Sequence, residues 1–597
     1  MRAQPQRRDA EAQRRRGRAI ALSAPLPLCV SALKQFARIA SSSIVAARHR
    51  LAPGKDGTGV ASAWLPALAA GALALTVYVL TLAPGLSFDN YGTDGGDLIA
   101  AAYTLGVPHP TGYPLYTLLA WLFTRLPIGV IAYRVNLLSA VCAAGTVALL
   151  CDLARQLLPP LDAGGDAAAP LPAWLLPAAT ALTLAFSSLL WSQAVISEVY
   201  ALLAFLAALL LWLLLRWRAG GPDRALYLAA LVLGLGLGNH VTLVFAAPAA
   251  LVLLWPQRQR WLRPRVLLGA LALFLLGLSI YAYLPLAARH HPPVNWGDPQ
   301  TWRGFLWVVT ARQYQQFAFG LAPAAVPGRL ADWALLLGRQ FGWWGLLISL
   351  VGARAWWRRD RTLALAALAW SLPLAVYAFF YDTGDSHVYL LPPLLFLALA
   401  WGYGAAGLPG QVADLAARLR DRAARRRGGL GRTLAPAVLV LLVLLSLGLH
   451  WAAAEPDDDW QVQAYIHQVL EPLEPGALVI VRGDSPTFAL WYGVYAEQER
   501  TDVAVVSGPL LAFIWYREHV RHLYPDLVVP EPGPGDDTID DVTRILIAAN
   551  LPLRAVYATD PSDVVKGWYD FVPVGEAPVY RARLPGEGAP SGEGAPP

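Results

Sequence analysis

Residues 93–114 read TDGGDLIAAAYTLGVPHPTGYP and lie between two long apolar runs. Asp94 and Asp97 stand three residues apart at the start of a predicted helix, so their carboxylates share one helix face. A turn containing Pro and Gly follows, and such a turn holds the imidazole of His109 and the phenol of Tyr113 in fixed directions. The stretch therefore predicts a polar site in a loop beside a membrane.

Helix capping is the competing interpretation of the two carboxylates. Asp94 is a suitable N-cap residue, and Asp97 in the first turn would complement the helix dipole. The spacing alone does not separate a capped helix from a pair of functional acids.

The chain around this stretch is typical of an integral membrane protein. Of its 597 residues 56% are hydrophobic and 15% charged, and the mean hydropathy is +0.44. Apolar runs of about 20 residues recur, each long enough to cross a bilayer as a helix. We predict a mainly α, polytopic membrane helix bundle of about eleven spans. The predicted spans are 63–85, 132–157, 173–191, 197–216, 225–239, 241–256, 265–286, 332–353, 362–381, 388–407 and 433–452.

Arginine clusters follow every second predicted span, which is the pattern of cytoplasmic loops. Arg216 and Arg218 follow the fourth span, for example, and a dense run from Arg418 to Arg432 follows the tenth. We therefore expect the N-terminus inside and the C-terminal region on the non-cytoplasmic side of a plasma (inner) membrane. The same placement of charge argues against nucleic-acid binding.

Four parts of the chain differ in composition. Residues 1–60 predict a basic, disordered cytoplasmic tail, and residues 61–453 a transmembrane domain with an outer loop at 86–131. Residues 454–585 alternate short apolar runs with amphipathic segments, which predicts an α/β domain on the outer face. Its strands are expected at 478–481, 503–506, 527–529 and 554–558, and its helices near 459–470, 486–497, 510–523 and 538–549. Residues 586–597 predict a disordered tail.

Further candidate residues fall in the predicted outer loops. Glu198 and His240 stand at the outer ends of spans, where ionisable groups are costly and are functional candidates by default. Asn295 and Asp298 belong to an Asn-Trp-Gly-Asp-Pro run that Arg312 follows. A turn with an interfacial tryptophan explains that run without any function.

The opening stretch resembles the signature of a family of multi-spanning membrane proteins. That family includes the eukaryotic transmembrane protein O-mannosyltransferase and is assigned to the GT-C class of glycosyltransferases. Its pattern is roughly Asp-Ser-Gly-Glu-Phe followed by His-Pro-Pro-Gly-Tyr-Pro. Asp94, His109 and Tyr113 match the pattern, whereas Asp97 stands where Glu is commoner and Thr111 where Pro is commoner. Residues 295–299 and 313–314 also resemble family elements, and the resemblance covers roughly residues 63–320.

The resemblance implies a glycosyltransferase that uses a polyprenyl-phosphate-linked sugar, at a site in contact with membrane lipid. It transfers the sugar to a hydroxyl of a protein or glycan acceptor on the outer face. Asp94 and Asp97 are the catalytic candidates, because an acceptor hydroxyl needs a general base. The departing phosphate needs positive charge or donors. The candidate substrate-binding residues are His109, Tyr113, Glu198, His240, Asn295, Asp298 and Arg312. No metal site or cofactor is identified, and a need for a divalent cation stays open.

A transporter or flippase of a lipid-linked glycan is the alternative. Transporters place coupling charges near the bilayer midplane, in broken helices of repeated halves. Here the carboxylates gather in outer loops and no internal repeat is evident, which favours an enzyme.

Overall fold

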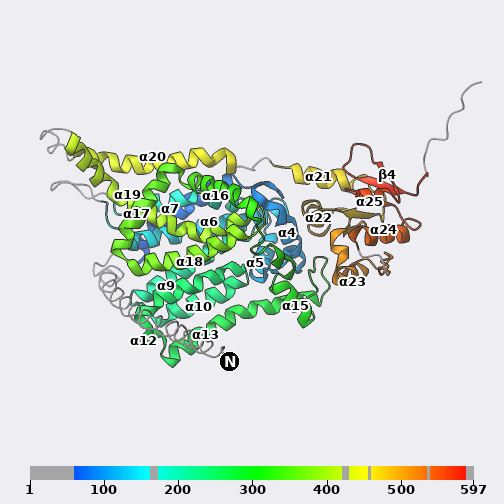
Figure 1. The fold of residues 1–597 in the computed structure, drawn as a ribbon, viewed down its shortest axis with the longest axis horizontal. Coiled ribbons are helices and arrows are strands. Elements are labelled where there is room, and N and C mark those ends of the chain that lie inside the picture. The colour runs from blue at the N-terminus through cyan, green and yellow to red at the C-terminus, as the bar shows by residue number, and fades with distance from the viewer. Residues whose placement is uncertain (1–59, 162–171, 420–428, 455–458, 534–537, 587–597) are drawn as a thin grey trace, which may run out of the picture.

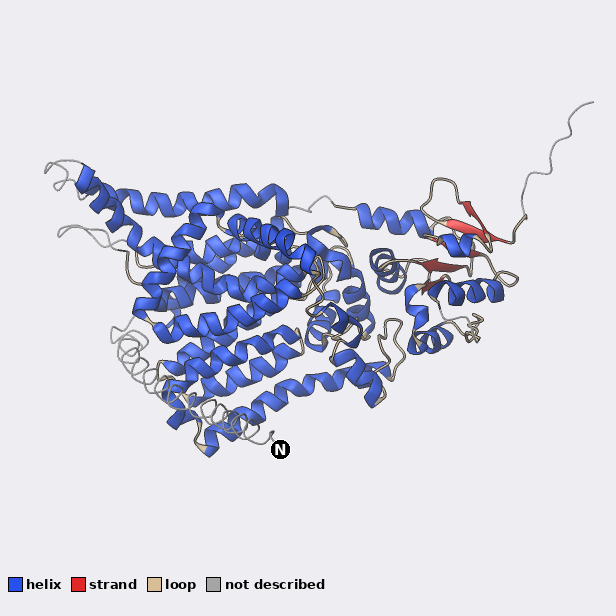
Figure 2. Ribbon diagram, viewed as in Figure 1, coloured by secondary structure: helices blue, strands red, loops and turns tan. Residues whose placement is uncertain are grey.

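The structure is a computed structural model that describes residues 60–161, 172–419, 429–454, 459–533 and 538–586. Helices form a large bundle, and a small α/β domain lies at one end of it (Figures 1 and 2). The predicted fold class, a mainly α bundle with a small C-terminal sheet, is confirmed. The two predicted disordered tails lie outside the described residues, apart from their inner boundaries.

The bundle consists of apolar α-helices joined by short 3₁₀ turns. Its elements are α3 (Val60–Leu80), η1 (Asp89–Asp94), α4 (Gly95–Thr104), α5 (Pro114–Thr124), α6 (Ile131–Leu157), α7 (Leu175–Ala185), α8 (Ser188–Ala194), α9 (Tyr200–Arg218), α10 (Asp223–Leu237), η2 (Val241–Phe245), α11 (Ala246–Leu254), η3 (Trp255–Gln257), α12 (Arg258–Trp261), α13 (Pro264–Leu278), η4 (Ser279–Ala282), α14 (Tyr283–Ala288), α15 (Trp302–Val309), η5 (Arg312–Phe317), η6 (Pro323–Ala325), α16 (Val326–Gln340), α17 (Gly342–Arg359), α18 (Arg361–Phe380), η7 (Ser386–Leu390), α19 (Leu391–Leu419) and α20 (Gly429–Ala454).

Many of these helices are suited to cross a membrane. Among the described residues, six helical stretches are long and apolar enough to do so, and two bent helix pairs raise that number to eight. Shorter apolar helices at Trp64–Leu80 and Pro436–Ala452 add to the bundle. Every predicted span overlaps helical structure. The polytopic bundle is therefore confirmed, while the total of eleven spans stays a prediction.

Two predicted spans are wrong as single straight helices: 173–191 bends by 68° between α7 and α8, and 332–353 bends at Gly342. The stretch Pro323–Gln340 meets α17 at an angle of 88°. Gly342 lies in the break with a φ of +68°, a left-handed conformation that stops a right-handed helix. Leu330 and Leu335 on α16 are exposed. This amphipathic helix therefore runs across the direction of the following span.

Ion pairs join the basic ends of the spans. Arg218, in the last turn of α9, donates two hydrogen bonds to Asp360 at 2.8 and 2.9 Å. Asp360 lies between α17 and α18 and accepts a backbone hydrogen bond at the start of α18. Two of the predicted cytoplasmic loops therefore meet at the same side of the bundle.

The α/β domain contains a five-stranded mixed sheet in the order β2-β1-β3-β5-β4. Strand β1 is parallel to β2 and to β3, whereas β5 is antiparallel to β3 and to β4. The elements are α21 (Gln461–Leu470), β1 (Leu478–Val481), α22 (Asp484–Trp491), the π-helical turn η9 (Tyr492–Ala496), β2 (Ala504–Ser507), η10 (Pro509–Ala512), α23 (Ile514–Leu523), α24 (Ile539–Asn550), β3 (Val556–Ala558), α25 (Asp563–Lys566), β4 (Asp570–Pro573) and β5 (Tyr580–Arg583).

The four predicted helices of this domain and three of its strands are confirmed, within one or a few residues at their ends. The strand expected at 527–529 is wrong. Val528 exchanges its backbone hydrogen bonds with the side-chain amide of Asn550, at 3.1 and 2.7 Å, instead of with a strand. Strands β4 and β5 were not predicted, because β4 (DFVP) does not alternate between apolar and polar residues and β5 (YRAR) alternates over only four residues.

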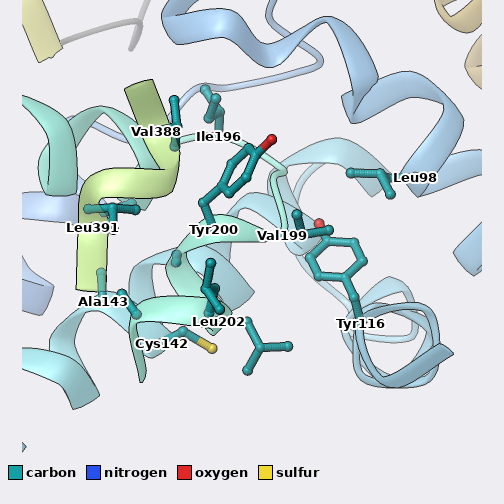
Figure 3. Close-up of a cluster of buried hydrophobic side chains, with 14 of the residues drawn as sticks. Leu98, Tyr116, Cys142, Ala143, Ile196, Val199, Tyr200, Leu202, Val388 and Leu391 are labelled. Carbon is teal, nitrogen blue, oxygen red and sulfur yellow. The ribbon is translucent and has the colours of Figure 1, made fainter. Parts of the chain in front are cut away.

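The domain packs directly on the 86–131 loop of the bundle, which is predicted to lie on the outer face. Helix α22 lies against η1 and α4. The backbone N–H of Ile131 donates to Glu497 at 3.0 Å, and His519 Nε2 lies 2.9 Å from the carbonyl oxygen of Pro293. Below this contact, Leu98, Tyr116 and Val199 belong to a buried apolar cluster that joins three segments of the bundle (Figure 3). The outer loop is thus fixed from both sides.

Candidate active site

The side chain of Asp97 lies next to His109 and has no exposed surface. Its Oδ2 accepts the backbone N–H of His109 at 2.9 Å and lies 2.7 Å from Nδ1 of the same residue. Its Oδ1 accepts the indole N–H of Trp296 at 2.9 Å. A carboxylate has lone pairs for all of these donors, so Asp97 is a satisfied buried acceptor that fixes the imidazole.

Aromatic rings enclose His109 on several sides. Tyr113, Trp296, Tyr314 and Phe488 lie with ring centroids 5.0, 6.3, 6.4 and 6.4 Å from its imidazole. The local turn is tight, because Gly112 has a φ of +83°. These contacts leave the ring a single orientation, with Nδ1 on Asp97 and Nε2 turned away from it.

Asp94 faces the other side of the imidazole. Its Oδ2 lies 3.5 Å from Nε2 of His109, and its side chain is 37% exposed. Asp94 occupies the N-cap position of α4 but makes no side-chain capping bond. Helix capping therefore does not explain this carboxylate. It is positioned to meet both the imidazole and a ligand.

Neighbouring charges and burial shift the pKa values of His109 and Asp94. Burial opposes the charged imidazolium, but the carboxylates of Asp94 and Asp97 outweigh burial and raise the pKa of His109 to about 9. Burial also raises the pKa of Asp94 to about 6, against the opposing effect of His109. At neutral pH the imidazole of His109 is therefore protonated and the neighbouring Asp94 carboxylate is mostly ionised.

Two further predicted substrate-binding residues, His240 and Glu198, lie close to Tyr113. The ring of His240 is stacked on that of Tyr113 at 6.2 Å, and its Nδ1 lies 2.7 Å from the Thr242 hydroxyl. Burial lowers the pKa of His240 to about 3, so it is neutral and supplies no charge for a phosphate. Glu198 is buried, and burial raises its pKa well above the ordinary value, as do the nearby carboxylates.

Three of the predicted substrate-binding residues, Asn295, Asp298 and Arg312, lie in the 295–312 segment. Asn295 Nδ2 donates to Asp298 at 3.2 Å, so these two side chains shape the turn. The turn places the indole N–H of Trp296 within hydrogen-bonding distance of Asp97. Arg312 is exposed, and no ion pair of its guanidinium is recorded in the described chain. Trp296 and Tyr314, which stand close to Asn295 and Arg312 in the sequence, contact the imidazole of His109.

A second group of polar residues surrounds a cavity of about 400 Å³ next to η1. Arg329 donates to the Ser386 hydroxyl at 2.9 Å and to carbonyl oxygens of the 381–386 loop. His387 contacts the ring of Tyr91, three residues before Asp94, at 4.8 Å. Arg339 also lines the cavity, and its guanidinium has no recorded ion pair within the described ranges. These residues carry no local sequence signal, because they come together only through the bend after α16.

Comparison with known proteins identifies related sequences. The family model described as "Protein O-mannosyl-transferase TMEM260 N-terminal domain" matches residues 94–262, and "TMEM260-associated domain 2" matches residues 462–527. Protein O-mannosyl-transferase TMEM260 of Mus musculus is 28% identical over 474 residues, covering 75% of this chain and 63% of the relative. The Dictyostelium discoideum protein of the same name is 23% identical over 496 residues, covering 74% and 57%. The chain thus spans about three fifths of the length of these curated relatives.

The solved structure of ArnT from Cupriavidus metallidurans, bound to undecaprenyl phosphate, shares the fold. It superposes with a TM-score of 0.50 at 12% identity, over 85% of this chain and 96% of ArnT. The first family match begins at Asp94, and the second includes α22, which packs on η1 and α4. Residues 94–262 and 462–527 are therefore similar to two TMEM260 domains, and the chain shares the fold of ArnT.

Proposed function

We propose that the protein is a membrane glycosyltransferase that moves a sugar from a polyprenyl phosphate to an acceptor hydroxyl at the outer face. The observation that carries this proposal is the geometry of one pair. The partly exposed Asp94 carboxylate lies 3.5 Å from an imidazole that the buried Asp97 holds from behind. The names of the relatives suggest a mannosyl group and a protein acceptor, and the ligand of ArnT suggests the lipid.

Asp94 acts as the general base in this proposal. With a pKa of about 6, its carboxylate is about nine-tenths ionised at pH 7. The acceptor oxygen attacks the anomeric carbon while its proton passes to Asp94. The bond from the anomeric carbon to the phosphate oxygen breaks, and polyprenyl phosphate leaves. A single displacement of this kind inverts the anomeric configuration.

His109 and Asp97 prepare the base. The positive imidazolium keeps the Asp94 carboxylate ionised against the burial that opposes it. Asp97 orients that imidazole from behind and touches no open surface, so it is a positioning residue in this scheme rather than a second base. The sequence resemblance to the GT-C family implied that Asp94 and Asp97 are both catalytic.

The donor phosphate requires positive charge close to Asp94. The cavity between α16 and the 381–387 loop offers Arg339, beside Arg329, which pairs with Asp382 at 3.9 Å, and Tyr91 connects the cavity to η1. Exposed apolar residues of α16 lie beside it, which suits a lipid that approaches from the membrane. This cavity fits a phosphate better than His240, which is neutral, or Arg312, for which no contact with the site is recorded within the described ranges.

Substitution of Asp94 by Asn tests the proposal. The purified protein receives polyprenyl-phosphate mannose and a Ser/Thr peptide, and glycopeptide is measured by mass spectrometry. We expect transfer to fall by about 10²–10⁴-fold, with donor binding retained. Asp89→Asn is the matched control, since Asp89 is an exposed acid in the same 3₁₀ segment. Near-normal transfer by Asp94→Asn would reject Asp94 as the base.

A further inference from the structure

Helix α22 of the α/β domain lies against both elements that carry the acids of the site. It packs on η1, which ends at Asp94, and on α4, which contains Asp97. The approach is very close, because a Cβ atom at Gly96 would lie 2.3 Å from the carbonyl oxygen of Phe488. The phenyl ring of Phe488 is stacked on the imidazole of His109, with ring centroids 6.4 Å apart and planes inclined by 15°.

Asp484 stands four residues before Phe488 and so shares its helix face. Its side chain is exposed, and no hydrogen bond or ion pair of its carboxylate is recorded for the described part of the chain. Its charge is one of those that raise the pKa of His109. An acid in the first turn also favours the helix dipole. That general effect does not account for the stacked Phe488 or for the contact with Gly96.

Large aromatic contacts hold α22 in this place. Trp296, which donates to Asp97, lies 6.3 Å from Trp491 of α22 and 5.9 Å from Trp515 of α23. The same tryptophan lies 6.3 Å from Phe488. The α/β domain and the outer loop therefore share one aromatic core, directly behind the imidazole.

Resting on the proposed transferase function, we propose that the α/β domain completes the active site and recognises the acceptor. Phe488 is a positioning residue that fixes the imidazole plane. Asp484 binds the acceptor, and because a carboxylate only accepts hydrogen bonds, its partner is a donor. Asp484 and Asp94 together make the part of the site that receives the acceptor acidic. The acceptor is therefore a polypeptide with a basic side chain near its hydroxyl.

The acceptor role of Asp484 is tested with two peptides that differ by an Arg or a Gln beside the Ser/Thr. In the full-length protein, Asp484→Asn should raise KM for the Arg peptide about tenfold, the usual scale for one charged hydrogen bond, and change kcat less. The Gln peptide should be affected little. Asp526→Asn, at an exposed acid of the same domain, should leave both unchanged. An unchanged KM for the Arg peptide, or an equal rise for both peptides, would overturn the assignment.

The positioning role of Phe488 needs a measurement that does not depend on transfer. Diethyl pyrocarbonate modifies neutral imidazoles, and mass spectrometry follows His109 across pH. Phe488→Ala should speed its modification and lower kcat, and Phe488→Tyr should restore both. Asp484→Asn should lower the pH at which modification is half-maximal. Unchanged modification in both variants would overturn the placement. If the wild type transfers no sugar, the proposed function fails, while modification and binding of a fluorescent Arg peptide still test this inference.

Discussion

Oδ2 of Asp97 accepts the backbone N–H of His109 at 2.9 Å and lies 2.7 Å from Nδ1 of the same imidazole. One buried oxygen thereby fixes both the chain direction and the ring of His109. The ring nitrogen left over, Nε2, is the atom that faces Asp94. The two acids of the signature stretch thus have different surroundings although they stand three residues apart.

Asp97→Asn is expected to damage both stability and rate. An amide would set an N–H₂ group against a donor from His109 or Trp296, and a buried donor left unpaired costs about 1–3 kcal/mol. The melting temperature and kcat should both fall. Trp296→Phe is the milder comparison, because it removes one donor and keeps a ring. A fully active and stable Asp97→Asn protein would contradict the positioning role.

The rate should depend on pH through both members of the pair. Protonation of Asp94 removes the base, so kcat/KM should fall as the pH drops below about 6. As the pH rises through about 9, His109 loses the positive charge beside Asp94 while Asp94 stays ionised, so a change on this limb reports the loss of the imidazolium and not the loss of the base. The two limbs belong to the coupled pair. A flat profile between pH 5 and pH 10 would exclude Asp94 as the base. A shift of about one pH unit in the position of either limb would not exclude it.

Arg339→Gln should weaken use of the donor specifically. If this guanidinium binds the donor phosphate, its loss should raise KM for polyprenyl-phosphate mannose about tenfold and leave KM for the acceptor unchanged. Arg354→Gln, at an exposed arginine in the second half of α17, is the control. Equal effects of the two substitutions, or a rise in acceptor KM alone, would move the donor site away from this cavity.

The sequence was informative where the structure is local. Asp94, Asp97, His109 and Tyr113 lie within one stretch of about 20 residues, so a helix start and a rigid turn suffice to bring them together. The helix predicted to start at the two carboxylates is confirmed as α4. The difference in role between the two acids could not be predicted, because it depends on which of them Trp296 covers.

Residues distant in the chain were missed for a physical reason. Phe488 meets His109 through packing between two domains, and no periodicity within either segment signals that contact. Arg329 and Arg339 reach the cavity only because the chain bends at Gly342, which lies within an apolar run that resembles one span. Hydropathy reports whether a segment is apolar and gives no information about where it turns.

Gly96→Ala tests the contact between the two domains on which the complete site depends. A methyl group at this position would lie 2.3 Å from the carbonyl oxygen of Phe488, and this backbone atom belongs to a helix and cannot rotate away. Helix α22 must then move off α4, and the imidazole loses its stacked neighbour.

We expect kcat to fall by at least about tenfold and limited proteolysis to cut faster between the domains, since misplacing catalytic groups by an ångström costs up to 10²-fold. Gly448→Ala is the matched control, because this glycine also lies in a helix, α20, and nothing lies within 4 Å of a Cβ atom at that position. It makes the same chemical change without a clash and should leave both measurements unchanged. If Gly96→Ala keeps full activity while its proteolysis pattern shows the domains apart, the α/β domain is not part of the catalytic site, and the bundle alone performs the reaction.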